Sequence, residues 1–419
     1  MIEETFEDLM REEQKRQNIT CELIASENFP SKRILNMCGS CLTAKYAEGY
    51  PGKRYYGGCQ WIDKIEQKAI DNACELFNCN FANVQPHCGS SANQAVYRAF
   101  CKPGDTVLGM DLSHGGHLSH GHKMSFSGQD YNIVSYGVDE NGILDYKDLE
   151  QKLWKYHSNM IIVGASSYSR IIDYERVARI IEDYVNTTGA PKPIYFVDMA
   201  HVAGLIAAGV HPSPFPWADV VTSTTHKTLR GPRGGLILWN NSEYTKKINS
   251  AVFPGVQGGP LEHIIAAKGI CFEEAMTEEF KEYGRQIIKN AIAFSDAFKR
   301  LGWKVISDGT DNHMFVLDVY NSIGLTGKEV ETLLDEVNIT ANKNQIPNDT
   351  LSPLVSPGLR IGTPAMTTKG FKEKDFDCLA HIIDRFLREY INGKNIDTDI
   401  LKENTREAVK RLINRAEEK

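Results

Sequence analysis

The stretch MIIVGASSYSRIIDYERVARIIEDYVNTTGAPKPIYFVD, residues 160–198, decides the fold class of this 419-residue chain. Short apolar runs open and close it, at 160–164 and 193–198, and each has the length of a buried strand. Between them, residues 173–184 have the spacing of an amphipathic helix. A strand, a helix and a second strand in this order indicate a parallel pair joined by a crossover helix.

The same alternation extends toward the N-terminus. Residues 105–110 form another short apolar run, and residues 145–156 have the pattern of another helix. We therefore predict a three-layer α/β domain, with a mainly parallel sheet and helices on both faces. In sheets of this kind, ligands bind in the loops at the carboxyl ends of the strands.

Beyond about residue 260 the pattern changes, and we expect a second, smaller α+β domain. A long helical region at 260–300 precedes strands at 304–307 and 314–320 and helices at 327–338, 370–392 and 397–416. The predicted organisation is an N-terminal arm with a helix at 1–20, a large domain at 21–283 and a small domain at 284–419.

Composition excludes several classes of protein. A net charge of −7 argues against a dedicated nucleic-acid-binding protein. No apolar run approaches the length of a membrane span, so no membrane association is expected. The N-terminus, MIEETFEDLM, is acidic and amphipathic and lacks the features of a signal or transit peptide. We therefore expect a cytoplasmic location.

Ten cysteines in a chain of this size do not indicate a disulfide scaffold. Cys38 and Cys41 have the spacing of a redox or zinc site, but no second CxxC pair completes a four-cysteine zinc site. We interpret them as two partly buried thiols on one turn. The sequence leaves open whether they respond to oxidants.

The segment TSTTHKTLRGPRGG, residues 222–235, singles out Lys227. A strand-like run at 218–225 leads directly into this lysine, and a Gly/Pro/Arg turn follows it. A lysine in this position is suited to a Schiff base with an aldehyde cofactor such as pyridoxal phosphate. The alternative is a solvated lysine beside a loop. Asp198, at the end of an apolar strand, is suited either to hold a pyridinium nitrogen protonated or to cap a helix.

Two glycine-containing segments are candidate phosphate sites. Residues 87–93, HCGSSAN, lead from a strand into a helix, whose first N–H groups and small hydroxyl side chains suit a phosphate. Gly258 and Gly259 form a second loop whose backbone could approach a phosphate. Either segment is also compatible with an ordinary turn.

Residues 114–122, HGGHLSHGH, look at first like a metal site. The segment has no cysteine or carboxylate and no fixed helical spacing, so we predict no metal there. The two alternatives are a histidine that stacks on a cofactor ring, which the neighbouring glycines permit, and a structural loop.

Two further segments carry polar groups in unusual settings. Arg360 lies within a predicted strand among apolar neighbours and needs an anion, either a substrate carboxylate or a structural ion-pair partner. Residues 45–58, KYAEGYPGKRYYGG, are dense in tyrosine, glycine and charge, as in many binding-site loops. Within this loop Glu48 is a candidate proton carrier. The alternative is that the tyrosines of the loop only pack against the rest of the protein.

From about residue 20 to the C-terminus, the chain resembles the serine hydroxymethyltransferases, pyridoxal-phosphate enzymes of the aspartate aminotransferase fold type, fold type I. Several long motifs in the right order carry the resemblance. They are LIASEN at 23–28, KYAEGYPGKRYYGGC at 45–59, VQPH at 84–87, VDMAHVAG at 197–204, the Lys227 segment and Arg360.

The resemblance implies transfer of the hydroxymethyl carbon of serine to tetrahydrofolate, which gives glycine and 5,10-methylenetetrahydrofolate. It implies that Lys227 holds pyridoxal phosphate and that Glu48 is the acid/base group. The implied catalytic set is Lys227, Asp198, Glu48, His226 and Tyr56. The implied cofactor-binding residues are Lys227, Asp198, Cys88, Gly89, Ser90, His117, Ser166, His201, Tyr46 and Gly259.

For the substrates, the resemblance implies that Arg360 and Ser26 bind the amino acid carboxylate. It further implies a homodimer, or a tetramer, in which Tyr46, Glu48, Tyr56 and Gly259 reach into the site of the other subunit. The residues implied to meet the folate are Tyr55, Leu112, Gly116, Leu118, Asn344, Ser352, Pro353 and Leu354.

Three positions depart from the family pattern. Cys88 and Ser91 replace a serine and a glutamine near the phosphate, and Leu354 replaces a frequent phenylalanine. We keep two rival functions: an aldolase that acts on β-hydroxy amino acids without folate, and a cofactor-binding regulator or RNA-binding protein without turnover. Two features argue against the aldolase: the loop that contains Glu48, and Asn344. The acidic net charge argues against the regulator.

Overall fold

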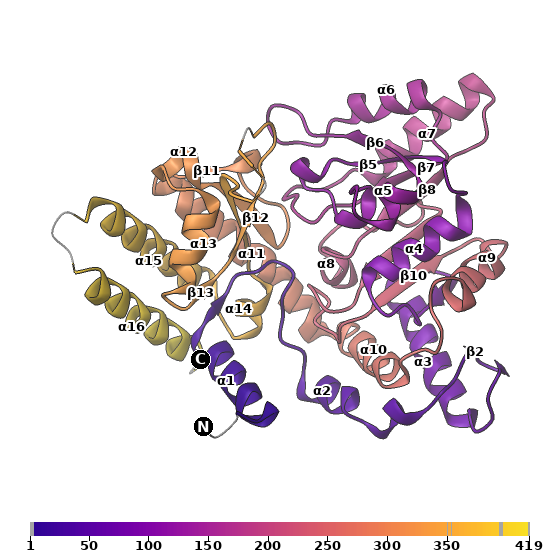
Figure 1. Ribbon diagram of the computed structural model, residues 1–419, viewed down its shortest axis with the longest axis horizontal. Coiled ribbons are helices and arrows are strands. Elements are labelled where there is room, and N and C mark those ends of the chain that lie inside the picture. Colours follow the sequence, from indigo (N-terminus) through magenta and orange to yellow (C-terminus); the bar gives the residue numbers. More distant parts are fainter. Residues whose placement is uncertain (1–3, 350, 353, 394–396, 418–419) are drawn as a thin grey trace. The chain divides into compact units, whose positions relative to one another are not determined.

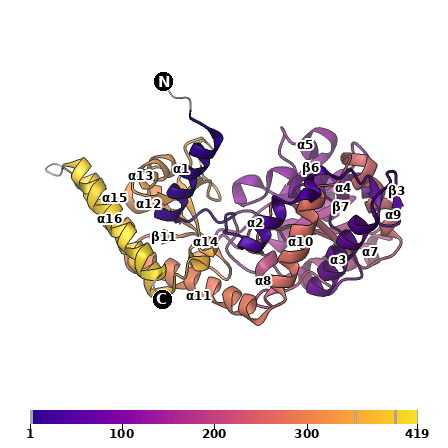
Figure 2. The same cartoon turned by 90° about the horizontal axis from the view of Figure 1, so that it is seen from below.

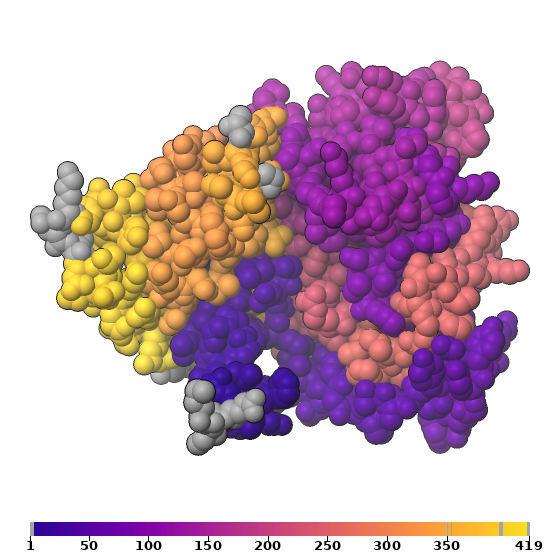
Figure 3. All heavy atoms as spheres, viewed as in Figure 1, coloured from indigo at the N-terminus to yellow at the C-terminus, as the bar shows by residue number. Residues whose placement is uncertain are grey.

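The computed structural model describes residues 4–349, 351–352, 354–393 and 397–417. The chain divides into two compact units. The large unit is Phe29–Arg285, and the small unit combines Met1–Asn28 with Gln286–Lys419. Figures 1 and 3 show the same division by colour, with N-terminal indigo beside C-terminal orange and yellow in the small unit.

A seven-stranded sheet forms the centre of the large unit, in the order β4-β10-β9-β8-β7-β5-β6. The five strands from β9 to β6 are parallel, whereas β10 is antiparallel to both of its neighbours. The predicted fold class, a mainly parallel α/β sheet with a smaller second sheet, is confirmed. The strands are β4 (Phe81–Asn83), β5 (Thr106–Met110), β6 (Asn132–Tyr136), β7 (Met160–Val163), β8 (Ile194–Asp198), β9 (Val220–Thr224) and β10 (Gly235–Trp239).

Helices cover this sheet, and Figure 1 shows α6 and α7 on one side and α4 on the other. Side-chain chemistry sets their ends: Asp173 caps α7 by accepting the N–H of Arg176 at 2.9 Å, and Gly189 closes it in a left-handed conformation. The helices are α2 (Lys32–Cys38), α3 (Gln60–Phe77), α4 (Gly89–Phe100), α5 (Phe126–Asp130), α6 (Tyr146–Tyr156), α7 (Tyr174–Thr188), α8 (Ala203–Ala207), α9 (Tyr244–Ser250) and α10 (Glu262–Ala275). A short hairpin, β2 (Gly49–Tyr50) and β3 (Lys53–Arg54), lies in the loop before α3.

The small unit contains a four-stranded antiparallel sheet, in the order β11-β12-β15-β14. Its core is rich in aromatic residues, and the ring of Phe294 contacts those of Phe298, Phe315 and Phe376. The strands are β11 (Lys304–Val305), β12 (Met314–Asp318), β14 (Asn342–Asn344) and β15 (Gly358–Gly362). The helices are α1 (Phe6–Ile19), α12 (Val319–Ile323), α13 (Gly327–Asp335), α14 (Pro364–Thr368), α15 (Glu373–Asn392) and α16 (Thr398–Glu417), and α15 and α16 pack side by side (Figure 2).

Several predicted boundaries differ from those of the structure. The helical region at 260–300 is two helices, α10 and α11 (Glu278–Arg300). The strand predicted at 304–307 ends at Val305, where a 3-10 turn begins. The strand predicted at 314–320 ends at Asp318, because this side chain accepts the N–H of Asn321 at 3.1 Å and starts α12.

The N-terminal segment belongs to the small unit through backbone pairing. Strand β1 (Cys21–Glu22) pairs in parallel with β13 (Ile339–Thr340), and Gly362 N–H donates to Leu23 O at 2.8 Å. A Cβ at Gly362 would lie 2.4 Å from the Cα of Ala25, so only glycine permits this approach. The segment that contains Ser26 is therefore packed against the strand that carries Arg360.

None of the helices in the described parts of the chain combines the length and the apolar character needed to cross a membrane.

Candidate active site

Asp198 and Lys227 follow neighbouring strands of the large sheet. Strands β8 and β9 are parallel, with Asp198 opposite Thr222, so their carboxyl ends meet at one edge. Asp198 ends β8 with its side chain 10% exposed. Lys227 comes just after β9 and is 9% exposed. The lysine and the carboxylate singled out in the sequence therefore lie at the same edge of the sheet.

The carboxylate of Asp198 is held by hydrogen bonds from three segments. His120 Nε2 lies 2.9 Å from Oδ2, Asn93 Nδ2 donates to the same oxygen at 2.8 Å, and Ala200 N–H donates to Oδ1 at 3.0 Å. Burial alone would raise the pKa of Asp198, but the hydrogen bonds from His120 and Asn93 and the charge of His120 outweigh it. Its pKa lies well below the ordinary value, and the group is ionised at neutral pH.

The same network orients His117. Asn93 Nδ2 donates to Ser119 Oγ at 2.8 Å, and Ser119 contacts His117 Nδ1 through its hydroxyl at 2.7 Å and its N–H at 3.1 Å. A backbone N–H can only donate, so Nδ1 of His117 is an acceptor and the ring carries its proton on Nε2. Asp198 and the predicted ring-stacking histidine are thus joined through Asn93 and Ser119.

Each of the four histidines at 114–122 has its own partner. His114 Nδ1 accepts the N–H of Val138 at 3.0 Å, and His122 Nδ1 accepts that of Met124 at 3.3 Å. Within the described ranges, the structure contains no group of three or more His, Cys, Asp or Glu residues that could hold a metal ion.

Two other predicted cofactor residues lie in loops at this edge of the sheet. Thr228 Oγ1 donates to His201 O at 2.8 Å and accepts the N–H of Gly204 at 2.9 Å, which fastens the loop after β8 to the residue next to Lys227. Ser166 follows β7, and its N–H donates to Gly115 O at 2.8 Å.

His226 is partly buried beside Lys227. Burial, followed by the charges of Arg233 and Lys227, lowers the pKa of His226 to about 3. The imidazole is therefore neutral at physiological pH, and its Nδ1 faces the N–H of Gly234 at 3.4 Å.

Residues 87–90, the part of the predicted phosphate segment 87–93 that leads into α4, form a cradle of backbone groups. The first intrahelical bond joins Ala92 N–H to Cys88 O at 3.1 Å, so the N–H groups of Gly89 and Ser90 precede it and point out of the helix. A Cβ at Gly89 would lie 2.7 Å from Thr224 Cγ2, which places the cradle against the end of β9. Thr224 Oγ1 is buried and, within the described ranges, has no hydrogen-bond partner.

The loop with Gly258 and Gly259 is bound to the strand that leads into the cradle. The side chain of Gln257 accepts His87 N–H at 3.2 Å and donates to Gln85 O at 2.8 Å. His87 Nε2 lies 3.2 Å from Gly259 O. The second glycine segment is thus held next to the first.

Lys268 supports the cradle from behind, and the sequence analysis did not identify it. Its buried Nζ donates to Val84 O at 2.7 Å, Pro86 O at 3.0 Å and Gly235 O at 2.8 Å. Gly235 pairs with Thr224 at the end of β9, so Lys268 ties the approach to the cradle to the hairpin that carries Lys227. Burial lowers the pKa of Lys268 to about 7, and only the ammonium form has a proton for each carbonyl.

Glu48 is positioned by a buried arginine. Arg54 Nη1 donates to the carbonyls on either side of it, Ala47 O at 2.8 Å and Gly49 O at 3.1 Å. Arg54 also contacts Glu66 at 2.6 Å and Asp63 at 2.8 Å. Glu262 lies 3.9 Å from the same guanidinium, and burial, with the nearby charge of Glu66, raises its pKa to about 8.

The tyrosines of this loop form an exposed cluster. Tyr46 and Tyr56 contact each other with ring centroids 5.2 Å apart, and Tyr55 lies 5.7 Å from Phe253. A Cβ at Gly259 would meet the Tyr46 ring at 3.1 Å, and one at Gly258 would meet Glu48 at 3.4 Å. Tyr46, Tyr55 and Tyr56 are 58%, 76% and 48% exposed.

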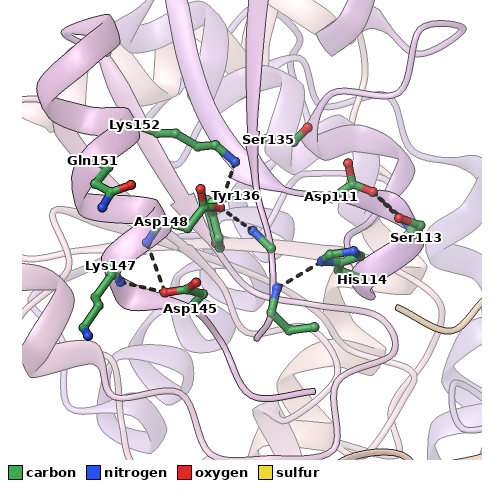
Figure 4. A pocket seen from close by; sticks show the side chains of 12 residues that line it. Asp111, Ser113, His114, Ser135, Tyr136, Asp145, Lys147, Asp148, Gln151 and Lys152 are labelled. Atoms are coloured by element: carbon green, nitrogen blue, oxygen red, sulfur yellow. Dashed lines mark hydrogen bonds and ion pairs between the residues drawn. The ribbon is translucent and has the colours of Figure 1, made fainter. Parts of the chain in front are cut away.

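The loop with Leu112, Gly116 and Leu118 follows β5. Asp111 Oδ1 accepts the N–H of Ser113 at 2.8 Å, and a Cβ at Gly116 would lie 2.2 Å from Met110 O. Leu112 and Leu118 are 38% and 52% exposed. Figure 4 shows the pocket next to this loop, lined by Asp111, His114 and polar residues of α6, and the residues proposed to hold the cofactor do not line it.

The remaining predicted residues belong to the small unit. Arg360 is partly buried, its Nε donates to Asn342 Oδ1 at 3.1 Å, and burial lowers its pKa to about 10. Ser26 lies in the segment packed on the same strand. Asn344 ends β14, Ser352 and Leu354 are exposed, and Pro353 lies outside the described residues.

Four residues of the site were not predicted from the sequence: His120, Asn93, Arg54 and Lys268. His120 lay within the noted histidine segment, and Arg54 within the tyrosine-rich loop. For Lys268 the available signal was a lysine in the apolar stretch IIAAKGICF, residues 264–272. Nothing in the sequence around Asn93 indicated its bond to Asp198.

The donor groups in the large unit fit pyridoxal phosphate. A helix N-terminus with free N–H groups suits a phosphate, an ionised buried carboxylate suits a protonated ring nitrogen, and a buried lysine suits an aldehyde. Together with the seven-stranded sheet, these groups define a pyridoxal-phosphate-dependent enzyme of fold type I.

Comparison with known proteins identifies the family. The model of the serine hydroxymethyltransferase family matches residues 1–383. The chain is 55% identical over 390 residues to serine hydroxymethyltransferase 2 of Colwellia psychrerythraea, covering 93% of this chain and 92% of that protein. It is 54% identical over 387 residues to a probable serine hydroxymethyltransferase of Mesomycoplasma hyopneumoniae, covering 92% and 91%. The chain belongs to the serine hydroxymethyltransferase family, and its activity is the pyridoxal-phosphate-dependent conversion of serine and tetrahydrofolate to glycine and methylenetetrahydrofolate.

Replacing Lys268 by methionine should weaken cofactor binding, because three buried carbonyls lose their donor and the two segments lose their link. We expect the Kd for pyridoxal phosphate to rise about tenfold or more. Absorbance titration of the apoenzyme measures it. The exposed Lys246→Met variant is the control, and an unchanged Kd in Lys268→Met would contradict the role.

Replacing Cys88 by serine should strengthen cofactor binding. Cys88 caps α4 at the cradle and its thiol is a weak donor, whereas a hydroxyl would add a full hydrogen bond to a phosphate. We expect the Kd to fall about three- to tenfold, with Cys41→Ser, an exposed cysteine elsewhere, as the control. Equal Kd values for Cys88→Ser and the native enzyme would contradict this prediction.

Proposed function

We propose that the residues gathered at the edge of β8 and β9 carry out the family's reaction in the roles expected from the sequence. The observation that carries the proposal is the parallel pairing of these strands, which brings buried Asp198 and buried Lys227 to one edge. When bound, pyridoxal phosphate supplies an electron sink for the α-carbon of the amino acid. The other tasks fall to side chains and backbone groups of the chain.

The cofactor-binding roles follow from chemistry. Lys227 binds the aldehyde. Asp198, kept ionised by His120 and Asn93, holds a proton on the ring nitrogen. The residues that complete the site are Cys88, Gly89 and Ser90 for the phosphate, His117 for the ring face, and Ser166 and His201 for the phenolic oxygen.

We assign the substrate roles residue by residue. The Arg360 guanidinium suits the carboxylate of serine, with Ser26 beside it. Glu48 moves a proton at the hydroxyl of serine, and the buried Arg54 fixes the backbone on both sides of it. We assign folate contacts to Tyr55, Leu112, Gly116, Leu118, Asn344, Ser352, Pro353 and Leu354.

We propose that the active sites are shared in a homodimer, with Tyr46, Glu48, Tyr56 and Gly259 serving the neighbouring subunit. The exposure of the tyrosine cluster supports this, since large aromatic side chains are costly to leave in water. We also propose a cytoplasmic location, supported by ten free cysteines.

Dependence on folate separates the proposed reaction from its rivals. Conversion of serine to glycine, measured with and without tetrahydrofolate, should require the folate. Lys227→Ala should lose about three orders of magnitude or more in rate and should lose the visible absorbance of the bound cofactor. Equal turnover without folate would favour the aldolase, and bound cofactor without any turnover would favour a regulator.

Mixing two inactive variants tests the shared site. In a dimer of one Lys227→Ala chain and one Glu48→Gln chain, one of the two sites has both residues intact if Glu48 crosses to the partner. After random exchange of subunits, activity should recover to about a quarter of the native value. If Glu48 serves its own chain, no site is intact and the mixture stays inactive. A mixture of Glu48→Gln with Tyr56→Phe is the control, because both residues come from the same loop, so each site of the mixed dimer receives one altered residue and the mixture stays inactive.

A further inference from the structure

Two cysteines lie together at the end of α3. The helix closes with Asn78 in the left-handed region at φ 52°, its N–H donates to Glu75 O at 3.3 Å, and Cys79 N–H donates to Cys74 O at 3.0 Å. These are the two bonds of a Schellman motif, in which the residues in the positions of Cys74 and Cys79 bring their side chains into contact. Here both side chains are thiols, so the motif brings the two thiols together at the end of the helix.

The two thiols differ in their surroundings. Cys74 is half-buried, whereas Cys79 is 8% exposed and its Sγ lies 3.6 Å from Phe81 O. The contact between them lowers the pKa of Cys74 and raises the pKa of Cys79. Cys74 is thus the more accessible and the more acidic thiol, as in a dithiol with an attacking and a resolving cysteine.

The pair has no part in the transfer of the one-carbon unit. Neither cysteine is among the residues assigned to the cofactor, the substrate or the folate. Neither forms a disulfide in this structure. The backbone bonds of the helix end already hold the two residues side by side. Bond formation between the sulfurs therefore needs no closure of a flexible loop.

We propose that Cys74 and Cys79 form a redox-active dithiol that closes reversibly to a disulfide by exchange with a small-molecule disulfide. The Cys74 thiolate attacks one sulfur of that molecule, forms a mixed disulfide and releases the first small thiol. The Cys79 thiol gives up its proton and attacks the Cys74 sulfur, which releases the second small thiol. Two electrons pass from the protein to the small disulfide, and both thiol protons end on the two released thiols.

The chain contains its own control in Cys38 and Cys41. This pair has the CxxC spacing of many redox sites, but Cys38 ends α2 and Cys41 begins a separate 3-10 helix. Burial raises the pKa of Cys38, which disfavours its thiolate. On our proposal, the pair without the sequence signature is the one that oxidises.

Peptide mapping of the full-length holoenzyme tests the proposal. The enzyme is incubated with oxidised glutathione and then cleaved at glutamate. Cleavage after Glu75 separates Cys74 from Cys79, so the two resulting peptides stay together only through a disulfide. We expect this linked pair of peptides, with fragmentation placing the bond at Cys79 and not at Cys88 or Cys101 of the same peptide, and its loss on addition of reduced glutathione. Linkage between Cys38 and Cys41 alone, or no linkage at all, would overturn the proposal.

Two single variants distinguish the roles of the thiols. Cys79→Ser should accumulate the mixed disulfide at Cys74, because no resolving thiol remains, whereas Cys74→Ser should give little mixed disulfide at Cys79. The double variant Cys38→Ser/Cys41→Ser should oxidise like the native enzyme. If a variant does not fold, phenylarsine oxide, which bridges adjacent thiols, is applied to the native enzyme. Protection of Cys74 and Cys79 from alkylation then supports the pair, and their full alkylation counts against it.

Discussion

The buried charge of Asp198 is the constraint on which the site of the large unit depends. A carboxylate removed from water requires hydrogen-bond partners, and leaving one unpaired costs several kcal/mol. Its partners come from α4, from the loop after β5 and from the loop after β8. Satisfying a single charge thus fixes three segments that are distant in the sequence. The same network fixes the position of the proton on His117 through Ser119. The charge of Asp198 and the orientation of the His117 ring are therefore set together.

The buried ammonium group of Lys268 is stabilised in a different way from the carboxylate of Asp198. Lys268 is surrounded by carbonyl dipoles and, within the described residues, forms no salt bridge, so the charge of its ammonium form is not cancelled locally. Burial first, and then the charges of Arg233, Lys227 and Lys268, lower the pKa of His226 and keep it neutral. The result is a region of positive potential behind the start of α4, where the helix dipole already favours an anion. A phosphate at this position gains from both sources, although no side-chain cation has to reach it.

The sequence predicted the fold class and the two central residues because these depend on local patterns. Short apolar runs alternating with amphipathic helices indicate a parallel sheet, and the ends of strands show where Asp198 and Lys227 must lie. His120, Asn93 and Lys268 could not be found in this way, since their roles arise only when separate segments converge. The wrong strand end at Tyr320 has a similar cause: the apolar pattern continues through Val319, but a capping bond from Asp318 starts a helix there.

The loop that carries Glu48 has an exposed surface, and a buried group of charged side chains lies beneath it. Arg54, Glu66 and Glu262 have side chains 3% exposed or less, yet Glu262 has no hydrogen-bond partner within the described ranges. Replacing a buried ion pair by well-packed hydrophobic side chains of similar volume is often neutral or stabilising for the fold. What the guanidinium adds is directional: its Nη1 binds the carbonyls on both sides of Glu48 and so fixes the backbone at that one residue. Such rigidity has little value for a loop that only covers its own domain. On the proposal of a shared site, it has value for a loop that delivers a carboxylate and two tyrosines to the neighbouring subunit, since a pre-ordered segment loses less conformational entropy when it docks.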